Sequence, residues 1–347
     1  MKYLSVCSGI EAATVAWHPL GWQAVGYSEI EKFPSQVLAH HYPNVPNFGN
    51  MTKFKEWNLE SNVDVFVGGT PCQSFSVAGL RKGLDDPRGN LMLTYLAIAD
   101  KYRPRWLVWE NVPGVLSSNG GKDFGTFLGG LGELGYGFAY RVLDAQYFGV
   151  AQRRRRVFVV GYLGDWRRAA AVLFERHSLS GDSAPLRKKR EGVTSSIGDS
   201  TQGGFDCGIE IMSVYENHPA DSRVQEMGEV CSTVTSRWGT GGGNLPMVNA
   251  IGVDTYNGTE TGQVSCTITA DVGGPTHSGP KVMQAMAVRR LLPKECERLQ
   301  GFPDDYTDIK PNGKQTSDGS RYKALGNSMA VPVMAWIGKR IQEVENL

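Results

Sequence analysis

Cys72 is the first residue of this sequence whose surroundings suggest chemistry. It lies in the segment GGTPCQSFS (68–76), directly after the apolar run 64–67. Pro71 restricts the backbone just before the thiol, and the glycines allow a tight turn. A cysteine on such a loop is either an inert core residue or a nucleophile, and a nucleophile has to be accessible as its thiolate. The polar residues on both sides of Cys72 favour a partly exposed thiol and therefore the nucleophile.

Glu110 is the candidate acid to work with that thiol. It follows the apolar run WLVW (106–109). Such neighbours would partly desolvate the carboxyl, raise its pKa and let it hold a proton near neutral pH. None of the six His residues falls in the same loops, so the pair differs from a Cys–His hydrolase. We expect the thiolate to attack an electron-poor ring that the acid protonates.

Two further segments could bind a nucleoside cofactor and an anion. The segment SGIE (8–11) opens a helix, and Glu29 follows the next apolar run, about 20 residues on, where an acid can accept from ribose hydroxyls. Taken separately, these residues could be a plain turn and a solvated acid. In QRRRR (152–156), Arg154 and Arg156 share one face of the following strand. They could bind phosphate by their fork geometry, or simply be a solvated basic run.

The elements that must position these residues alternate between strands and helices. Helices are expected at Glu11–His18 and Leu91–Tyr102, where apolar residues recur every three to four positions. This alternation predicts an α/β fold with a doubly wound, mostly parallel sheet. Ligands of such sheets bind at the carboxyl ends of the strands. Four of the predicted strands end directly before chemically able residues, namely the segment 7–9, Glu29, the Cys72 loop and Glu110. The predicted strands are Tyr3–Val6, Ala24–Tyr27, Asp64–Val67, Trp106–Trp109 and Val157–Val160.

Composition excludes several classes of protein. With 41 % hydrophobic residues among 347, the chain is globular, and its length suits two domains or one domain with an insertion. No run approaches the ~20 apolar residues of a membrane span, and the start resembles no secretory signal. Six dispersed cysteines without a CxxC pair predict neither a zinc site nor disulfides, so we expect a cytoplasmic protein without a metal. The net charge of +1 argues against nucleic acid.

Taken together, the motifs resemble those of the DNA cytosine-5 methyltransferases. The first motif departs from the family's Phe-x-Gly-x-Gly-Gly, because it is CSGIEA (7–12), and Asn50 stands where an acid usually contacts adenine. Asn50 can still form a hydrogen bond through its side-chain carbonyl. The resemblance covers nearly all of the chain except its middle third. The matching segments are TPCQSFS (70–76), RGNL (88–91), ENV (110–112), QxRxR (152–156), RxLxPxECxRLQGFP (289–303) and YKxxGNSMxVP (322–332).

The resemblance implies a fold, a cofactor and a set of site residues. The expected fold is that of class I S-adenosylmethionine-dependent methyltransferases. A catalytic domain (1–165 and 315–347) would carry a β- and loop-rich target-recognition domain (166–314). The catalytic residues would be Pro71, Cys72, Gln73, Glu110, Asn111, Arg154 and Arg156. S-adenosylmethionine would bind at Gly9, Ile10, Glu29, Ile30, Asn50, Met51, Pro71, Leu91, Asn327 and Ser328.

The implied reaction is methyl transfer to C5 of a cytosine flipped out of duplex DNA. Cys72 would add to C6 while Glu110 protonates or holds N3, and flipping costs a few kcal/mol. Arg154 would contact the base and help orient the acid, with Arg156 supporting it. We expect a monomer without an obligate protein partner. A cognate restriction nuclease is the one candidate for a functional partner. A tRNA cytosine-5 methyltransferase is the alternative; an inactive DNA-binding protein and a cysteine-dependent acyltransferase are weaker ones.

The middle segment, 166–285, is rich in Gly, Ser and Thr. A weak repeat relates 230–235 to 264–269, which predicts two similar β-hairpins unless the match is chance. Arg237, in a Gly-rich loop, could contact guanine or a phosphate. Residues 151–190 contain 11 Lys and Arg against 3 Asp and Glu. The near-zero net charge therefore hides a basic region that could attract DNA.

Overall fold

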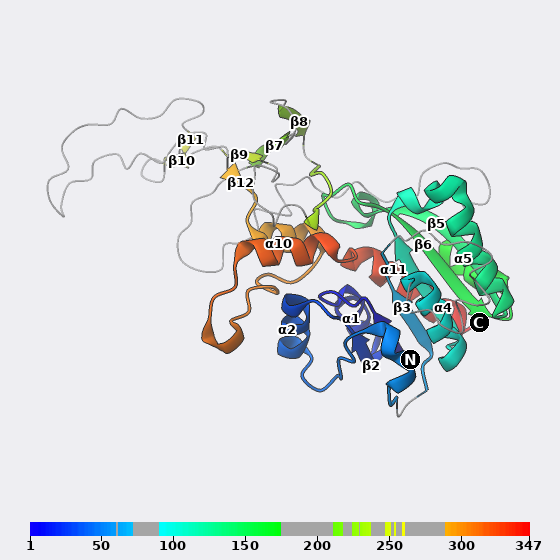
Figure 1. The fold of residues 1–347 in the computed structure, drawn as a ribbon. Helices are drawn as coiled ribbons and strands as arrows, with labels where there is room; N and C mark the ends of the chain where they lie inside the picture. Colours follow the sequence, from blue (N-terminus) through cyan, green and yellow to red (C-terminus); the bar gives the residue numbers. More distant parts are fainter. Residues whose placement is uncertain are drawn as a thin grey trace, which may run out of the picture.

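The protein is described by a computed structural model. It covers residues 1–59, 62–71, 90–174, 211–217, 224–228, 230–236, 247–250, 253–254, 259–260 and 289–347. Figure 1 shows a central sheet with helices on both faces and smaller β-elements above the end of the sheet opposite the chain termini.

A six-stranded sheet in the order β2-β1-β3-β4-β6-β5 forms the centre of the molecule. The pairs among β1, β2, β3 and β4 are parallel, whereas β6 runs antiparallel to both β4 and β5. The carboxyl ends of β1 to β4 therefore share one edge of the sheet. The strands are β1 (Lys2–Val6), β2 (Gln23–Ser28), β3 (Val65–Gly68), β4 (Trp106–Asn111), β5 (Tyr136–Asp144) and β6 (Arg155–Leu163).

The sheet is buried on both faces because its side chains alternate between two apolar cores. On β4, Trp106 and Val108 belong to one core. Leu107 and Trp109 belong to the other, as the period of two in a strand requires. The first core is covered by α1 (Ala12–Trp17), α6 (Trp166–Leu173) and α11 (Val331–Glu345). The second is covered by α4 (Leu91–Tyr102) and α5 (Lys122–Glu133).

The remaining elements flank this three-layer core. Three more helices are α2 (Lys32–His41), α9 (Pro293–Gln300) and α10 (Asp318–Asn327). Six short 3-10 helices lie among the described residues at His18–Leu20, Met51–Glu56, Pro113–Leu116, Ser118–Gly121, Ala145–Phe148 and Pro311–Gly313. A four-stranded sheet has the order β12-β9-β7-β8, and β10 pairs with β11. These strands are β7 (Ile211–Asn217), β8 (Val224–Gly228), β9 (Met247–Ala250), β10 (Val253–Asp254), β11 (Thr259–Glu260) and β12 (Arg289–Arg290).

The predicted fold class is confirmed, and all five predicted strands lie in the central sheet. The sequence missed β5, an edge strand whose half-exposed residues form no continuous apolar run. The proposed division at residue 165 stays a prediction. The next helix, α6, packs on β5, β6 and α11.

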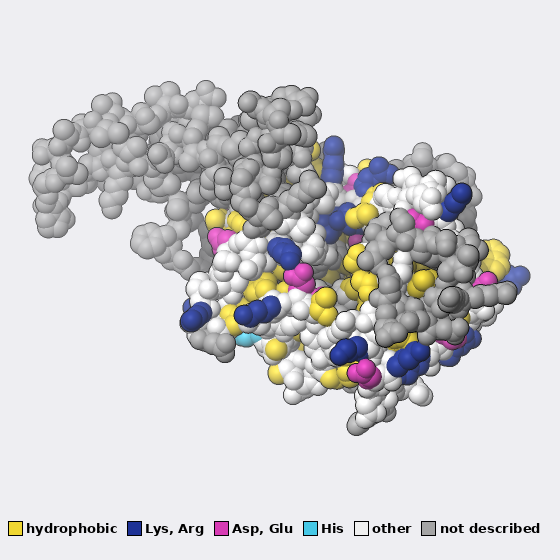
Figure 2. Space-filling view, in the orientation of Figure 1, with side chains coloured by type: hydrophobic (Ala, Val, Ile, Leu, Met, Phe, Trp, Pro, Cys, Tyr) yellow, Lys and Arg dark blue, Asp and Glu magenta, His cyan; other side chains and the backbone are white. Residues whose placement is uncertain are grey.

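The described residues contain neither a membrane-spanning helix nor a group of three metal-ligating side chains. No described helix is long and apolar enough to cross a membrane. No group of three His, Cys, Asp or Glu side chains in the described part could hold a metal ion. Figure 2 shows Lys and Arg side chains spread over the visible face, with Asp and Glu side chains beside several of them.

Candidate active site

A cavity of about 450 Å³ opens at the carboxyl ends of the parallel strands. Each of these strands contributes residues at or just beyond its end. Cys7 follows β1, Glu29 follows β2, Pro71 lies just beyond β3, and Glu110 is the second-last residue of β4. The volume is in the usual range for small-molecule sites in proteins. Chemically able residues that are far apart in the sequence therefore meet in one place.

The catalytic side of the cavity contains an ion pair between Glu110 and Arg156. The Nε atom of Arg156 lies 2.9 Å from Oε1 of Glu110, and the two side chains are only 16 % and 12 % exposed. Arg156 reaches the acid from β6, which pairs antiparallel with β4. Burial raises the pKa of the Glu110 carboxyl, while the charges of Arg156 and Arg154 act in the opposite direction. The acid is thus fixed in direction and can hold a proton more readily than a solvated glutamate.

The chain leading to Cys72 is held against the same acid. Asn111 donates from Nδ2 to the carbonyl oxygen of Thr70 at 2.9 Å. Trp109 donates from Nε1 to the Thr70 hydroxyl at 3.0 Å. A Cβ atom on Gly69 would lie 2.9 Å from Oε2 of Glu110, so a larger residue here would push the carboxyl aside. These contacts fix the backbone up to Pro71; Cys72 and Gln73 lie outside the described residues.

Arg154 has a different environment from Arg156 and is only 2 % exposed. It donates from Nη1 to the Val234 carbonyl at 2.8 Å and from Nη2 to the carbonyls of Gly326 and Ser328 at 3.0 and 2.6 Å. Burial, and then the charge of Arg156, lowers the pKa of the Arg154 guanidinium to about 9. It remains protonated at neutral pH. Arg156 makes the direct contact with the acid, whereas Arg154 donates to three backbone carbonyls and acts on Glu110 only through its charge. The expected contact of Arg154 with the base stays a prediction.

The segment 230–236 belongs to the support of this site. Gln152 accepts from Val234 N at 3.0 Å through Oε1 and donates through Nε2 to the Leu299 carbonyl at 2.7 Å. Cys231 is fully buried and pairs with Gln152 in a single parallel bridge. Residues 230–236 thus pack against the QxRxR segment and form no strand, and the Gly-rich turn expected to follow them lies outside the described residues. The second copy, 264–269, lies outside the described residues.

The cofactor side of the cavity is organised by Glu29. Its Oε2 accepts from Gly9 N at 2.8 Å and its Oε1 from Glu31 N at 2.7 Å. Each carboxylate oxygen keeps a further acceptor direction, which suits the two hydroxyls of a ribose. Ile30, beside it, is 73 % exposed.

Asn50 also lines this side of the cavity, but its carbonyl oxygen accepts from the backbone N–H and hydroxyl of Thr52. The expectation that this carbonyl contacts adenine therefore differs from the structure, because it already caps the 3-10 helix that follows. The Asn50 amide, a donor, is the group left for a ligand.

Most of the residues suggested by the sequence line this cavity, with two exceptions in the described part of the chain. Ile10 is fully buried in the core, and Ser328 lines a small adjoining cavity of about 30 Å³. Arg237 lies outside the described residues. The predicted residues that do line the cavity are Gly9, Glu29, Ile30, Asn50, Met51, Pro71, Leu91, Glu110, Asn111, Arg154, Arg156 and Asn327.

Other lining residues were absent from the predicted set. Several of them stand at the ends of predicted strands or within the motifs named above, so their position could have indicated the site. Nothing in the sequence indicates Gly49 or Ala324 as lining residues. These additional residues are Cys7, Ser28, Glu31, Pro34, Gly49, Gly69, Thr70, Val112, Ala324 and Gly326.

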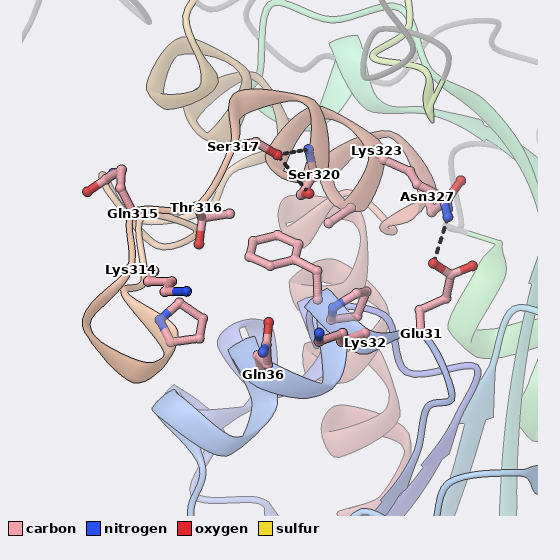
Figure 3. A pocket seen from close by; sticks show the side chains of 14 residues that line it. Glu31, Lys32, Gln36, Lys314, Gln315, Thr316, Ser317, Ser320, Lys323 and Asn327 are labelled. Atoms are coloured by element: carbon pink, nitrogen blue, oxygen red, sulfur yellow. Dashed lines mark hydrogen bonds and ion pairs between the residues drawn. The ribbon is translucent and has the colours of Figure 1, made fainter.

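A second cavity, of about 610 Å³, lies next to the first between α2, α10 and the segment 311–317. Figure 3 shows its labelled polar side chains coming from these elements. Glu31 and Asn327 line both cavities. Lys323 Nζ lies 2.6 Å from Glu31 Oε2, so an ion pair ties α10 to the segment between β2 and α2.

Solved structures share this fold. The S. pombe Dnmt2 methyltransferase matches all of this chain with all of its own, at a TM-score of 0.62 and 15 % identity. The Entamoeba histolytica methyltransferase EhMeth matches 99 % of this chain with 98 % of its own, at a TM-score of 0.59 and 13 % identity.

Relatives are similar in sequence along the whole chain. The "DNA N-6-adenine-methyltransferase" of Escherichia phage P1 is 38 % identical over 98 % of this chain, which spans only 61 % of that phage protein. The "Type II methyltransferase M.SsoII" of Shigella sonnei is 29 % identical over 98 % of this chain and 79 % of its own. The model of the family described as C-5 cytosine-specific DNA methylase matches residues 1–343. The chain therefore belongs to the C-5 cytosine-specific DNA methylase family.

Proposed function

We propose that this chain transfers a methyl group to C5 of a flipped-out cytosine within a specific sequence of duplex DNA. One observation carries the proposal. The Glu110–Arg156 pair faces the same cavity as Thr70 and Pro71, which lead directly to Cys72, and as the ribose-compatible acid Glu29. An acid, the approach to a thiol and a nucleoside site within one cavity suit methylation of a pyrimidine ring.

The methyl donor of this family is S-adenosylmethionine, which supplies an electrophilic methyl group when bound. The cavity fits such a group. Glu29 offers acceptors for the ribose, and the exposed Ile30 and the Met51 side chain offer apolar surface for the adenine. Asn50 would donate through its amide to a ring nitrogen. We assign the cofactor to these residues.

In the proposed reaction the Cys72 thiolate forms a bond to C6 of cytosine. The electron pair of the C5–C6 double bond is then available at C5, while Glu110 donates its proton to N3. Arg156 keeps the Glu110 carboxyl directed at the ring. Methylation of C5 leaves the donor as a neutral thioether. A base then removes the C5 proton, Glu110 takes back the proton from N3, the C5–C6 double bond re-forms and the Cys72 thiolate leaves. The raised pKa of Glu110 favours the protonated state that this step requires.

In the proposed enzyme Arg154 has a structural role beside the catalytic residues. Its three carbonyl partners belong to the 230–236 segment and to the end of α10. It would thereby hold the recognition region and the C-terminal helices in place around the cavity. We keep 166–314 as the proposed target-recognition domain and Arg237 as its candidate DNA contact. Since relatives are named Type II methyltransferases, a cognate nuclease is the proposed partner, in the cytoplasm where the DNA lies.

Two other substrates compete with duplex DNA cytosine. A tRNA cytosine would use the same cysteine and acid. The printed name of the phage P1 relative points instead to N6 of adenine. Methylation of an exocyclic amine needs no thiolate addition to a ring carbon, so it leaves Cys72 without a task. The cavity chemistry therefore favours cytosine.

The test is methylation in vitro followed by mass spectrometry of the nucleosides. The purified chain, labelled S-adenosylmethionine and either plasmid DNA or tRNA should yield 5-methylcytosine from the DNA alone. Cys72→Ala should abolish transfer while duplex binding persists, and bisulfite sequencing gives the site. N6-methyladenine as the product, transfer only to tRNA, or normal turnover by Cys72→Ala would overturn the proposal.

A further inference from the structure

The loop between β1 and α1 has an unusual backbone for its sequence. Residues Cys7, Gly9 and Glu11 all adopt left-handed conformations, with φ of 49°, 56° and 63°. Only five non-glycine residues of the described chain have positive φ, and two of them lie in this loop. Such conformations are unfavourable for residues with a Cβ and persist only when surrounding contacts hold them. The loop must therefore be held by specific interactions.

The side chain of Glu11 provides these interactions. Its carboxyl is buried, with the residue 1 % exposed. Oε1 accepts from the Ser5 hydroxyl at 2.5 Å, and Oε2 accepts from the Thr14 hydroxyl at 2.6 Å and the Thr14 N–H at 3.2 Å. The last bond caps the N-terminus of α1. One carboxyl thus joins β1 to α1 across the loop.

The same contacts extend to the cofactor side of the cavity. The Ser8 hydroxyl lies 3.1 Å from the Ser5 hydroxyl and accepts from Ser28 N at 3.2 Å. This places Gly9 so that its N–H donates to Oε2 of Glu29 at 2.8 Å. The Glu11 carboxyl is therefore connected, through Ser5 and Ser8, to the loop that aligns Glu29.

We propose that Glu11 is a positioning residue for the cofactor: its buried carboxyl holds the 7–11 loop in the form that fixes Glu29 and Gly9. Glu11 stands where the family pattern has a glycine. A glycine adopts this φ freely but has no side chain to accept hydrogen bonds. In Glu11 the three hydrogen bonds to the carboxyl offset the unfavourable backbone conformation. The inference rests on the cofactor of the proposed function and does not depend on which base is methylated.

Calorimetry of S-adenosylmethionine binding, without DNA, tests this inference. Glu11→Ala removes all three bonds, and we expect its Kd to rise about tenfold or more. At saturating cofactor its kcat should stay within about threefold, so the effect appears in KM. Glu11→Gln should bind nearly as the wild type, because its carbonyl can accept both Thr14 bonds while its amide donates to Ser5. Glu11→Gly serves if the alanine variant does not fold, since it keeps the backbone and lacks the carboxyl.

Asp123 provides a matched control. It is another fully buried carboxyl, bonded to the Ser118 hydroxyl at 2.6 Å near the start of α5, and does not line the cofactor cavity. Asp123→Ala should lower thermal stability without changing the Kd. Wild-type binding by Glu11→Ala and Glu11→Gly, equal weakening by Asp123→Ala, or a Glu11→Gln variant as weak as alanine would overturn the inference. A wild-type chain that binds the cofactor but methylates no cytosine would overturn only the proposed function.

Discussion

Replacing Arg154 with leucine separates folding from catalysis at this site. The substitution removes a buried guanidinium that donates to the carbonyls of Val234, Gly326 and Ser328. Leucine can donate to none of them. Because these acceptors belong to segments far apart in the sequence, the variant should loosen the packing of 230–236 and α10 on the sheet.

The size of the effect follows from the three bonds. A buried acceptor left without its donor costs about 1–3 kcal/mol, and the three are not independent. Removing the guanidinium also removes the cost of burying its charge, which offsets part of this loss of stability. The Arg154 Nε atom adds to that cost, because it has no hydrogen-bond partner among the described residues. We therefore expect a loss of about 3–5 kcal/mol. For a protein of this size, that lowers Tm by roughly 6–15 °C.

The assay pairs differential scanning fluorimetry with methyl transfer at a temperature where both variants are folded. Arg156→Leu is the comparison, because its partner is the catalytic Glu110 rather than backbone carbonyls. We expect Arg154→Leu to lose stability and keep much of its kcat. Arg156→Leu should lose about 100-fold in kcat but less Tm than Arg154→Leu, because it leaves one buried acceptor, the Glu110 carboxyl, which can take up a proton. The opposite pattern, or equal losses of Tm, would refute this division of roles.

Three further predictions concern the walls of the cavity and its acid. Gly326→Ala places a Cβ about 2.2 Å from the backbone of 235–236, so chemical denaturation should show that the free energy of unfolding falls by about 2 kcal/mol or more. A denaturation midpoint equal to that of the wild type would contradict the close packing. Gly69→Ala pushes against the Glu110 carboxyl, so steady-state kinetics should show kcat falling about tenfold while Tm changes little. An unchanged kcat would show that the carboxyl moves freely. Arg156→Gln removes a charge that lowers the pKa of Glu110, so the alkaline limb of kcat/KM should move to higher pH; a shift to lower pH would exclude Glu110 as the proton donor.

Most residues predicted for the site line one cavity because a parallel sheet brings its strand ends together. The strand-end residues Cys7, Glu29, Pro71 and Glu110 span about a hundred positions of the sequence, yet each lies at or shortly after the end of an apolar run. Once those runs are strands of one parallel sheet, their carboxyl ends must share an edge. The raised pKa of Glu110 was likewise predictable, because fully apolar neighbours in β4 precede it.

The roles of Arg154 and Arg156 could not be obtained in the same way. Alternation along a strand predicts that both side chains lie on one face, and both do line the cavity. Which of them meets Glu110 depends on the register between β6 and β4 and on the docking of 230–236. Both are tertiary features that no local pattern encodes. The prediction for Asn50 differs from the structure for a similar reason. Its side-chain carbonyl caps a short 3-10 helix that the sequence did not indicate.

Duplex DNA carrying 5-fluorocytosine at the methylation site tests the covalent mechanism most directly. Fluorine at C5 cannot leave as the proton does, so the Cys72–C6 bond should persist after methylation. Denaturing electrophoresis and peptide mapping should then find one DNA strand attached to the peptide that contains Cys72, dependent on S-adenosylmethionine and absent in Cys72→Ala. Turnover of unmodified DNA with no trapped adduct, or an adduct at another residue, would contradict the central role of Cys72.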